Sequence, residues 1–303
     1  MPHKSRRMHV HQMTIGQFEA QFQDEDDCKS YLANNRWPNG VTCPRCDAPD
    51  ATEHGTMDWH WNCYKCDQDG YRFSVLKGTI FENTNKPLRQ WFRVMHLMLT
   101  SKKGSSALQI YRYMGFGSYS TALNMSNKIR VAMSGVEFRH LVGYVEINET
   151  FVGGKKTRKH KTDRDDWPKG GAGGKEIVVG AVKRKGNVAA RIISDISKET
   201  LDRFVHEVIS HKVRLISTDE HRGYLDVWKL GRHRVVRHSR GEYVNGAVHT
   251  NTIEGFWSMI KRGIMGTYHK VSRKYLPLNV AEFEFRYNNR MNADIFGAAI
   301  KAC

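Results

Sequence analysis

The sequence is short of acidic residues and has no long apolar run. Asp and Glu together number 31 against 48 Lys and Arg, which leaves a formal net charge of +17. No stretch of about 18 apolar residues occurs, so a membrane-spanning helix is excluded. The first residues, MPHKSRRMHVHQMT, are basic but lack the apolar centre of a secretory signal. We therefore expect a cytoplasmic protein with no membrane partner.

The excess of positive charge indicates the kind of partner. A compact fold with this imbalance repels itself unless a polyanion shares its surface. Nucleic acid is the favoured polyanion, because neutralising phosphates drives binding without any reading of sequence. A charge that only keeps the protein in solution is the alternative. At 303 residues, 40% of them hydrophobic, the chain is long enough for two or three globular domains.

Cysteine is scarce, and its spacing is informative. Four of the six cysteines form two CxxC pairs, while Cys28 and Cys303 stand alone. A disulfide framework is unusual in a chain of this size without a signal peptide. Two matched CxxC knuckles predict a tetrahedral zinc site, and four thiolates leave no open position, so the zinc is structural. A redox CxxC is the weaker reading, because it needs only one such motif. The predicted ligands are Cys43, Cys46, Cys63 and Cys66.

The chain divides into four predicted segments. Residues 1–38 form a helical lead-in, with Thr14 and the acidic run 24–27 as helix starts, and 39–80 form the zinc ribbon. Residues 81–138 are helical. A helix over 105–114, a Gly-Phe-Gly turn and a helix over 118–133 resemble a helix-turn-helix, and an ordinary helical linker is the alternative. In the last helix we expect Tyr119, Leu123, Ile129 and Val131 to face inward, and Lys128 and Arg130 to face outward.

Residues 139–303 have a mixed α/β pattern. The strand GYVEINETFVGG is followed by a hairpin turning at 185–187, a helix over 198–211, the buried strand VRLIST, a short strand at 234–236 and further helices. This order predicts a mixed sheet with helices on both faces.

Two acidic residues in this region suit metal-dependent phosphodiester chemistry. Asp219 directly follows the strand VRLIST, and Glu254 lies near the start of a helix that Asn251 or Thr252 can cap. Lys261 lies two turns further along the same helix face. Mg²⁺ requires oxygen ligands from separate elements, and two such ions activate attacking and leaving oxygens. Taken singly, Asp219 could be a turn former and Glu254 a capping partner.

Three stretches carry a family resemblance: VEINETFVGGK, STDEHRGY and HTNTIEGFWSMIKRGIMGTYHKVSRKYL with EFEFRYNNR. They strongly resemble IS1595-type (ISXO2-like) insertion-sequence transposases, as do the zinc ribbon and the helices after it. The resemblance implies a ribonuclease-H-like catalytic domain, Mg²⁺ or Mn²⁺ dependence, and binding to terminal inverted repeats and target DNA. It also implies a dimer or larger assembly in a prokaryotic cytoplasm, at the nucleoid. By resemblance Asp219 is the second catalytic acid, Glu254 the third, Lys261 the family's lysine, and Asn251 the asparagine near the third acid.

One position departs from the family pattern. Where the family strand reads like VEVDET, this sequence has Asn148, which keeps an oxygen but loses the charge that holds a metal. Three explanations are open: a variant inactivated to trap a DNA complex, a naturally degenerate copy, or an enzyme that uses Glu146, on the same strand face, instead. The first is favoured by the conservative change within an intact motif, and such a chain should bind DNA and cut poorly.

Basic clusters flank these motifs and are predicted to contact phosphates, with a solvated face as the alternative. The rival functions are a nuclease without strand transfer and a DNA-binding regulator derived from a dead transposase. The predicted DNA contacts are Lys128, Arg130, Lys155, Lys156, Arg158, Lys159, Arg232, Arg234 and Arg262.

Overall fold

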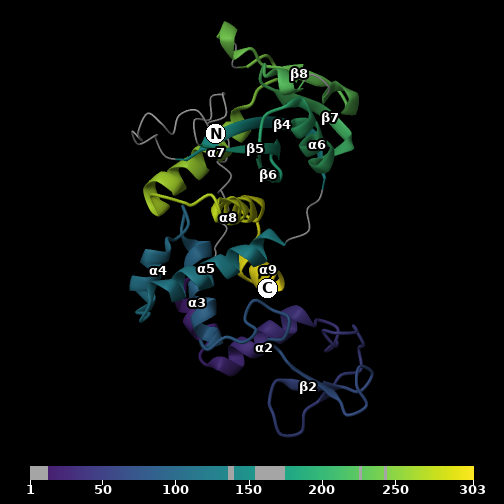
Figure 1. Ribbon diagram of the computed structural model, residues 1–303, viewed down its shortest axis with the longest axis vertical. Coiled ribbons are helices and arrows are strands. Elements are labelled where there is room, and N and C mark those ends of the chain that lie inside the picture. The colour runs from purple at the N-terminus through teal and green to yellow at the C-terminus, as the bar shows by residue number, and fades with distance from the viewer. Residues whose placement is uncertain (1–12, 136–139, 154–174, 225–226, 242–243) are drawn as a thin grey trace, which may run out of the picture. The chain divides into compact units, whose positions relative to one another are not determined.

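The computed structural model describes residues 13–135, 140–153, 175–224, 227–241 and 244–303 (Figure 1). The chain forms two compact units. Unit 1 comprises Met1–Val136 and Asn289–Cys303, and unit 2 comprises Glu137–Asn288. Within the described ranges, no helix is both long and apolar enough to span a bilayer.

Unit 1 begins with two capped helices, α1 (Ile15–Gln21) and α2 (Glu25–Arg36). Thr14 accepts the Gln17 N–H while the Gln17 side chain bonds back to Thr14, and Asp24 and Asp27 form the same reciprocal box. Such boxes satisfy N–H groups that the helix itself leaves unpaired. Both helix starts expected from the sequence are confirmed.

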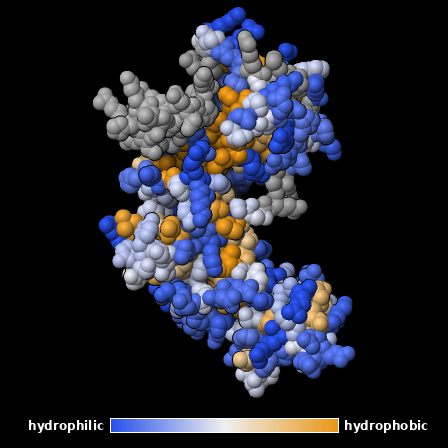
Figure 2. Space-filling model, in the orientation of Figure 1, coloured by the Kyte–Doolittle hydropathy of each residue, from blue (hydrophilic) through white to orange (hydrophobic). Residues whose placement is uncertain are grey.

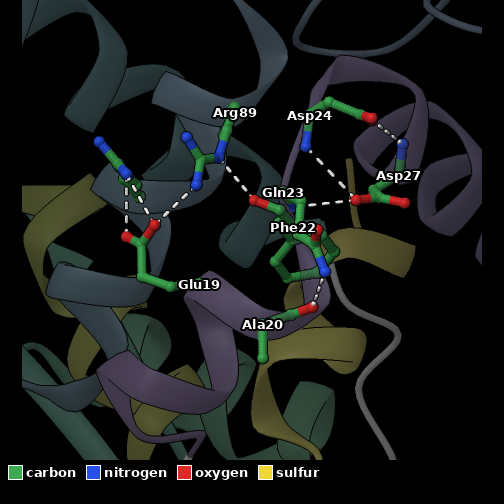
Figure 3. A network of polar contacts seen from close by, with 8 residues as sticks. Glu19, Ala20, Phe22, Gln23, Asp24, Asp27 and Arg89 are labelled. Atoms are coloured by element: carbon green, nitrogen blue, oxygen red, sulfur yellow. Dashed lines mark hydrogen bonds and ion pairs between the residues drawn. The ribbon is translucent and has the colours of Figure 1, made fainter.

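A polar network joins these helices to α3 (Leu88–Thr100), as Figure 3 shows around Arg89. The N-cap of α3 is Pro87, which has no capping side chain, and the Glu25 carboxylate instead accepts the N–H groups of Leu88 and Arg89 at 2.7 and 2.9 Å. The Arg89 guanidinium donates to the Phe22 carbonyl and to Glu19. A carboxylate from α2 therefore caps α3 and fixes how the two helices meet.

The ribbon is a small three-stranded antiparallel sheet in the order β1 (Thr52–Glu53), β2 (His60–Cys63), β3 (Tyr71–Ser74). Its core is a thin aromatic layer. Trp61 packs edge-on against Trp37 and stacks with Phe73. The ribbon surface seen in Figure 2 is largely hydrophilic. Little apolar area is buried, so the ribbon needs another source of stability.

Helices α3, α4 (Ala107–Met114) and α5 (Tyr119–Ser134) follow, with Gly115 ending α4 in the left-handed conformation (φ 63°). The helix-turn-helix-like element order is as expected, but the predicted faces of α5 are partly wrong. Tyr119 and Val131 are exposed, whereas Arg130 is only 3% exposed. The buried face of α5 contains residues 122, 125, 126, 129 and 133. Residue 130 lies about one helical turn after 126 and so falls on this face, whereas residue 131 is rotated by about 200° from 129 and faces away from it.

The last helix, α9 (Ile295–Lys301), belongs to unit 1 and packs against α2 and α3 (Figure 1, yellow beside purple and blue). The buried Phe296 ring lies 5.5 Å from that of Phe92 and 5.6 Å from that of Phe22. The sequence-based boundary assigned 139–303 to one domain, and the structure places 289–303 in unit 1 instead. A seven-residue helix gives no local signal of which core will bury it.

Replacing Phe296 with alanine should lower the free energy of unfolding of unit 1 by about 3–5 kcal/mol, because it opens a cavity among aromatic rings. Denaturant unfolding of the variant measures this loss. Met291→Ala, at a position 75% exposed, is the matched control and should change stability by less than about 0.5 kcal/mol. Equal effects of the two substitutions would contradict the placement of α9.

Unit 2 is built on a mixed five-stranded sheet in the order β6-β5-β4-β7-β8. Strands β4 (Leu141–Val152), β5 (Glu176–Lys183) and β6 (Val188–Ile193) form an antiparallel meander. Strands β7 (Ile209–Thr218) and β8 (His233–Val235) run parallel to β4 on its other side. The turn expected at 185–187 lies between β5 and β6, and the mixed sheet expected from the sequence is confirmed.

Helices cover both faces of this sheet (Figure 1). On one face α6 (Lys198–Val208) packs with Val145, Ile147 and the 3₁₀ turns Arg222–Tyr224 and Val227–Leu230. On the other, α7 (Asn251–Gly263), a π turn Ile264–Tyr268 and α8 (Leu276–Asn288) pack on Val178 and Val182. A third 3₁₀ turn spans His238–Arg240. Even-numbered residues of β4 thus face α7.

The boundary between α6 and β7 differs from the sequence prediction. The helix was expected to run to residue 211, but it ends at Val208 and β7 begins at Ile209. Leu141 of β4 pairs with Ile209 and draws it into the sheet. The helical spacing of Ile209 is outweighed by this tertiary pairing, which no local pattern reveals.

Candidate metal centre and candidate active site

The four ribbon cysteines converge on one point. The Sγ atoms of Cys43 and Cys66 are 3.6 Å apart, those of Cys46 and Cys63 are 3.7 Å apart, and all four lie within 4.8 Å of one another. These distances are too long for disulfide bonds. A tetrahedron with zinc–sulfur distances of about 2.3 Å has edges of about 3.8 Å. The predicted four-cysteine site therefore fits structural zinc.

The pKa values of the clustered thiols shift in opposite directions. Burial acts to raise the pKa of Cys43, but the backbone N–H groups of Arg45 and Cys46 and the neighbouring thiols outweigh it and lower this pKa to about 7. The Arg45 N–H points at Cys43 Sγ from 3.5 Å. The pKa of Cys66 moves the opposite way, raised chiefly by its hydrogen bond with Cys46, so the thiols of the cluster titrate as one coupled group. Among the described residues, no other group of three His, Cys, Asp or Glu side chains converges in this way.

The candidate active site begins where β4 and β7 run side by side. The parallel register pairs Glu146 with Ser217. The pairing ends there, two residues before Asn148 in β4 and before Asp219, which directly follows β7. Both residues are half-buried, and Asp219 Oδ1 accepts the His221 N–H at 3.0 Å. The first two positions of the predicted acid set therefore follow closely on the paired part of two neighbouring strands.

Helix α7 carries the remaining predicted residues. Its N-cap is Thr250, and neither Asn251 nor Thr252 caps it, contrary to expectation. The Thr250 hydroxyl donates instead to Glu254 Oε1 at 2.7 Å. The side chains of Asn251, Glu254 and Lys261 are exposed, and the last two lie seven residues apart on one helix face.

Close packing of α7 on the sheet depends on a glycine. Gly180 pairs with Asn148 across β4 and β5. A Cβ atom at this position would lie 2.6 Å from the Trp257 ring and 3.2 Å from Ile253. Both of these side chains belong to α7. Because Gly180 has no side chain, α7, the helix that carries Glu254, can pack directly against the residue of β5 that pairs with Asn148.

Gly180→Ala should destabilise unit 2 by about 1–3 kcal/mol, because the added methyl group forces the Trp257 ring and α7 away from the sheet. Thermal or denaturant unfolding provides the measurement. Gly255→Ala is the matched control, since that glycine lies on the open side of the same helix with no atom within 4 Å. It should be neutral or stabilising by up to about 1 kcal/mol. Similar losses from both substitutions would contradict the proposed contact.

Glu146 was the alternative first ligand, and its surroundings do not suit that role. Its side chain is fully buried. Both carboxylate oxygens accept hydrogen bonds from Thr252, and Oε1 also accepts one from Arg184. Both oxygens are therefore already hydrogen-bonded within the protein. This argues against the explanation that the enzyme uses Glu146 as its first ligand in place of position 148.

On the opposite face of the sheet, Tyr224 and Glu149 form a hydrogen-bonded pair that the sequence did not predict. The hydroxyl group of Tyr224 donates to Glu149 Oε2 at 2.6 Å. Burial raises the pKa of Glu149 and the Asp219 charge adds to this, while the tyrosine hydrogen bond opposes it. The alternation of β4 indicates which face Glu149 takes, but nothing in the sequence shows that Tyr224 is buried there.

The predicted DNA contacts divide into three sets. Lys155, Lys156, Arg158 and Lys159 lie outside the described residues. The side chains of Lys128, Arg232, Arg234 and Arg262 are exposed. The prediction that Arg130 contacts DNA is wrong. This residue lies on the buried face of α5 and its guanidinium donates to Asn127 Oδ1 at 3.1 Å, so it is not available to a phosphate.

Comparison with known proteins identifies two domains in the chain. Residues 140–288 match the ISXO2-like transposase domain, and residues 23–69 match the transposase zinc-ribbon domain. The chain carries both the catalytic-type and the zinc-ribbon domain of IS1595-type transposases. A relative in Halobacterium salinarum, described as an uncharacterized protein in transposable element ISH50, is 28% identical over 278 residues, which cover 88% of this chain and 91% of the relative.

The matched ranges follow the structural units. The ISXO2-like transposase domain ends at residue 288, where unit 2 ends. There Asn288, the last residue of α8, bonds both the N–H and the carbonyl of Val188 in β6. The zinc-ribbon match begins in the turn before α2 and includes all four cysteines.

Proposed function

We propose that this transposase binds the terminal inverted repeats of an insertion sequence and, with aspartate at position 148, catalyses metal-dependent end cleavage and strand transfer. As it stands, the chain binds DNA and cuts poorly. The proposal is supported by the parallel pairing of β4, which carries Asn148, with β7, which leads into Asp219, and by the packing of α7, which carries Glu254, on the β5 partner of Asn148.

Two of the three positions of the acid set carry carboxylates that could hold Mg²⁺ or Mn²⁺. Asp219 offers a half-buried carboxylate and Glu254 an exposed one. Asn148 offers only one oxygen, which already accepts the Glu149 N–H at 2.6 Å, and its NH₂ group cannot bind a cation, so this position is a much weaker ligand than aspartate. When bound, the ions would activate the attacking oxygen and stabilise the leaving one.

The chain's own residues hold the DNA. Lys261 lies on the same exposed face of α7 as Glu254, two turns away. An ammonium group there would hold the phosphate next to the scissile one and keep the end in register with the acids. Arg262 on α7 and Arg232 and Arg234 around the edge strand β8 add positive charge for the backbone.

The assembly follows from the reaction. An element has two ends that must be joined to one target, so we propose that two or more copies of the chain act together on DNA. A zinc ribbon and the helices α3–α5 would supply binding away from the catalytic sheet, as the net charge of +17 favours.

The test uses labelled terminal-repeat DNA and a supercoiled target with Mg²⁺. The Asn148→Asp protein should nick the end and yield a joined product, while the unmodified chain binds the same DNA without cutting. Cleavage without joining would favour the nuclease alternative. Binding without cleavage by either protein would favour a DNA-binding regulator.

A further inference from the structure

The start of α7 is capped by a residue from another element. Its N-cap, Thr250, makes no side-chain bond to the helix backbone. A helix leaves its first N–H groups unpaired, and these attract an acceptor or a negative charge. Here the Glu146 carboxylate of β4 accepts the N–H groups of Thr252 and Ile253 at 2.7 and 3.2 Å, and the Thr252 hydroxyl at 2.8 Å.

Arg184 locks the same carboxylate to the segment that leads into the helix. Its Nε donates to Glu146 Oε1 at 2.6 Å. Its Nη1 and Nη2 donate to the carbonyl oxygens of Ala247 and His249 at 2.6 and 3.1 Å. The His249 ring also approaches Glu146, with Nδ1 3.1 Å from Oε1. One guanidinium thus ties the β5–β6 turn, β4 and residues 247–249 together.

This arrangement links the positions that matter for the chemistry. Glu146 precedes Asn148 by two residues, so both project from the same face of β4 towards α7. Because Glu146 satisfies the helix backbone, the Thr250 hydroxyl is committed to Glu254 instead. The buried carboxylate of Glu146 therefore lies between two positions of the acid set: it shares the strand of Asn148 and caps the helix that carries Glu254.

We propose that Glu146 is a positioning residue, which with Arg184 holds the first turn of α7 against β4 so that Asn251 and Glu254 face the Asn148–Asp219 edge. This inference rests on the proposed function for its catalytic consequence, but its structural part stands separately. Glu146 acts through its negative charge as well as its shape, because it meets both a helix N-terminus and a guanidinium in a dry setting.

The experiment compares Glu146→Gln with Glu284→Gln. Glu284 is the matched control, because its carboxylate also accepts a backbone N–H, from Ala190, and an arginine, Arg191, but lies on α8. Hydrogen–deuterium exchange in the otherwise unmodified chain should show amides 252–254 exchanging at least about tenfold faster in Glu146→Gln only. This measurement needs neither metal nor DNA.

For the activity measurement, Glu146→Gln and Glu284→Gln are each introduced separately into the Asn148→Asp protein. Glu146→Gln should lower the cleavage rate at saturating DNA by about a hundredfold while leaving the DNA dissociation constant unchanged, because a displaced ligand costs rate rather than affinity. Glu284→Gln should stay within about twofold. Unchanged exchange at 252–254 would overturn the proposal, as would parallel losses in both variants that follow their melting temperatures. If Asn148→Asp itself does not cleave, the proposed function fails and exchange alone decides the role of Glu146.

Discussion

Asn148→Asp should raise the rate of Mg²⁺-dependent cleavage of terminal-repeat DNA by about a thousandfold, or about 4 kcal/mol of barrier. The change replaces one NH₂ group with a charged oxygen at a half-buried strand position. The Glu149 N–H that now bonds Asn148 Oδ1 would keep its partner. The second carboxylate oxygen would take the place of the amide nitrogen at the edge shared with Asp219.

Single-turnover cleavage of end-labelled DNA over a range of Mg²⁺ and Mn²⁺ concentrations measures this gain. Asn148→Asp combined with Asp219→Asn is the control and should return to the rate of the unmodified chain. The site assignment is wrong if the unmodified chain already cuts at the rate of the Asp variant. It is equally wrong if the double variant retains the gain.

Loss of zinc should unfold the ribbon and leave the sheet of unit 2 intact. Structural zinc contributes about 10–16 kcal/mol of apparent binding free energy near pH 7 in ribbon-sized modules. The apolar contacts that could replace it are few, chiefly Trp61 with Trp37 and Phe73. Chelation, or Cys63→Ser, should therefore expose Trp37 and Trp61 to water.

Zinc content per chain, tryptophan emission and limited proteolysis check this expectation together. One zinc per chain should fall to near zero in Cys63→Ser, with cleavage by protease confined to the region around 39–80. Cys303→Ser provides the control, because that thiol lies in unit 1 away from the four ligands and donates to Ala299. A ribbon that keeps its protection without zinc would contradict the structural role of the metal.

The elements that the sequence revealed are those encoded locally. Two CxxC pairs fix their own knuckle geometry, so all four ligands could be named from spacing alone. A run of apolar residues ending in Asp219 defines a strand and the residue at its end, and the structure has both. Thr14 and Asp24 cap their helices through side chains three residues away, which is also a local event.

The features that the sequence missed depend on contacts across the fold. The cap of α7 comes from Glu146, more than a hundred residues away in the chain, so the local candidates Asn251 and Thr252 were preferred. Arg130 was assigned outward because it is charged, although its helical position placed it on the buried face of α5. The hydrogen bond between Tyr224 and Glu149 forms only when the segment after β7 folds against β4, so neither residue could be singled out from its neighbours in the sequence.

The return of α9 to the first unit has a consequence for biosynthesis. Unit 2 is complete in sequence at residue 288, whereas the core around Phe22 and Phe92 lacks Phe296 until α9 has been made. The sheet that carries the acids can therefore fold before the aromatic core that precedes it in the chain is filled. A nascent chain stopped near residue 290 would contain all of unit 2 but lack part of the apolar core of unit 1, and exposed apolar surface of this kind favours aggregation.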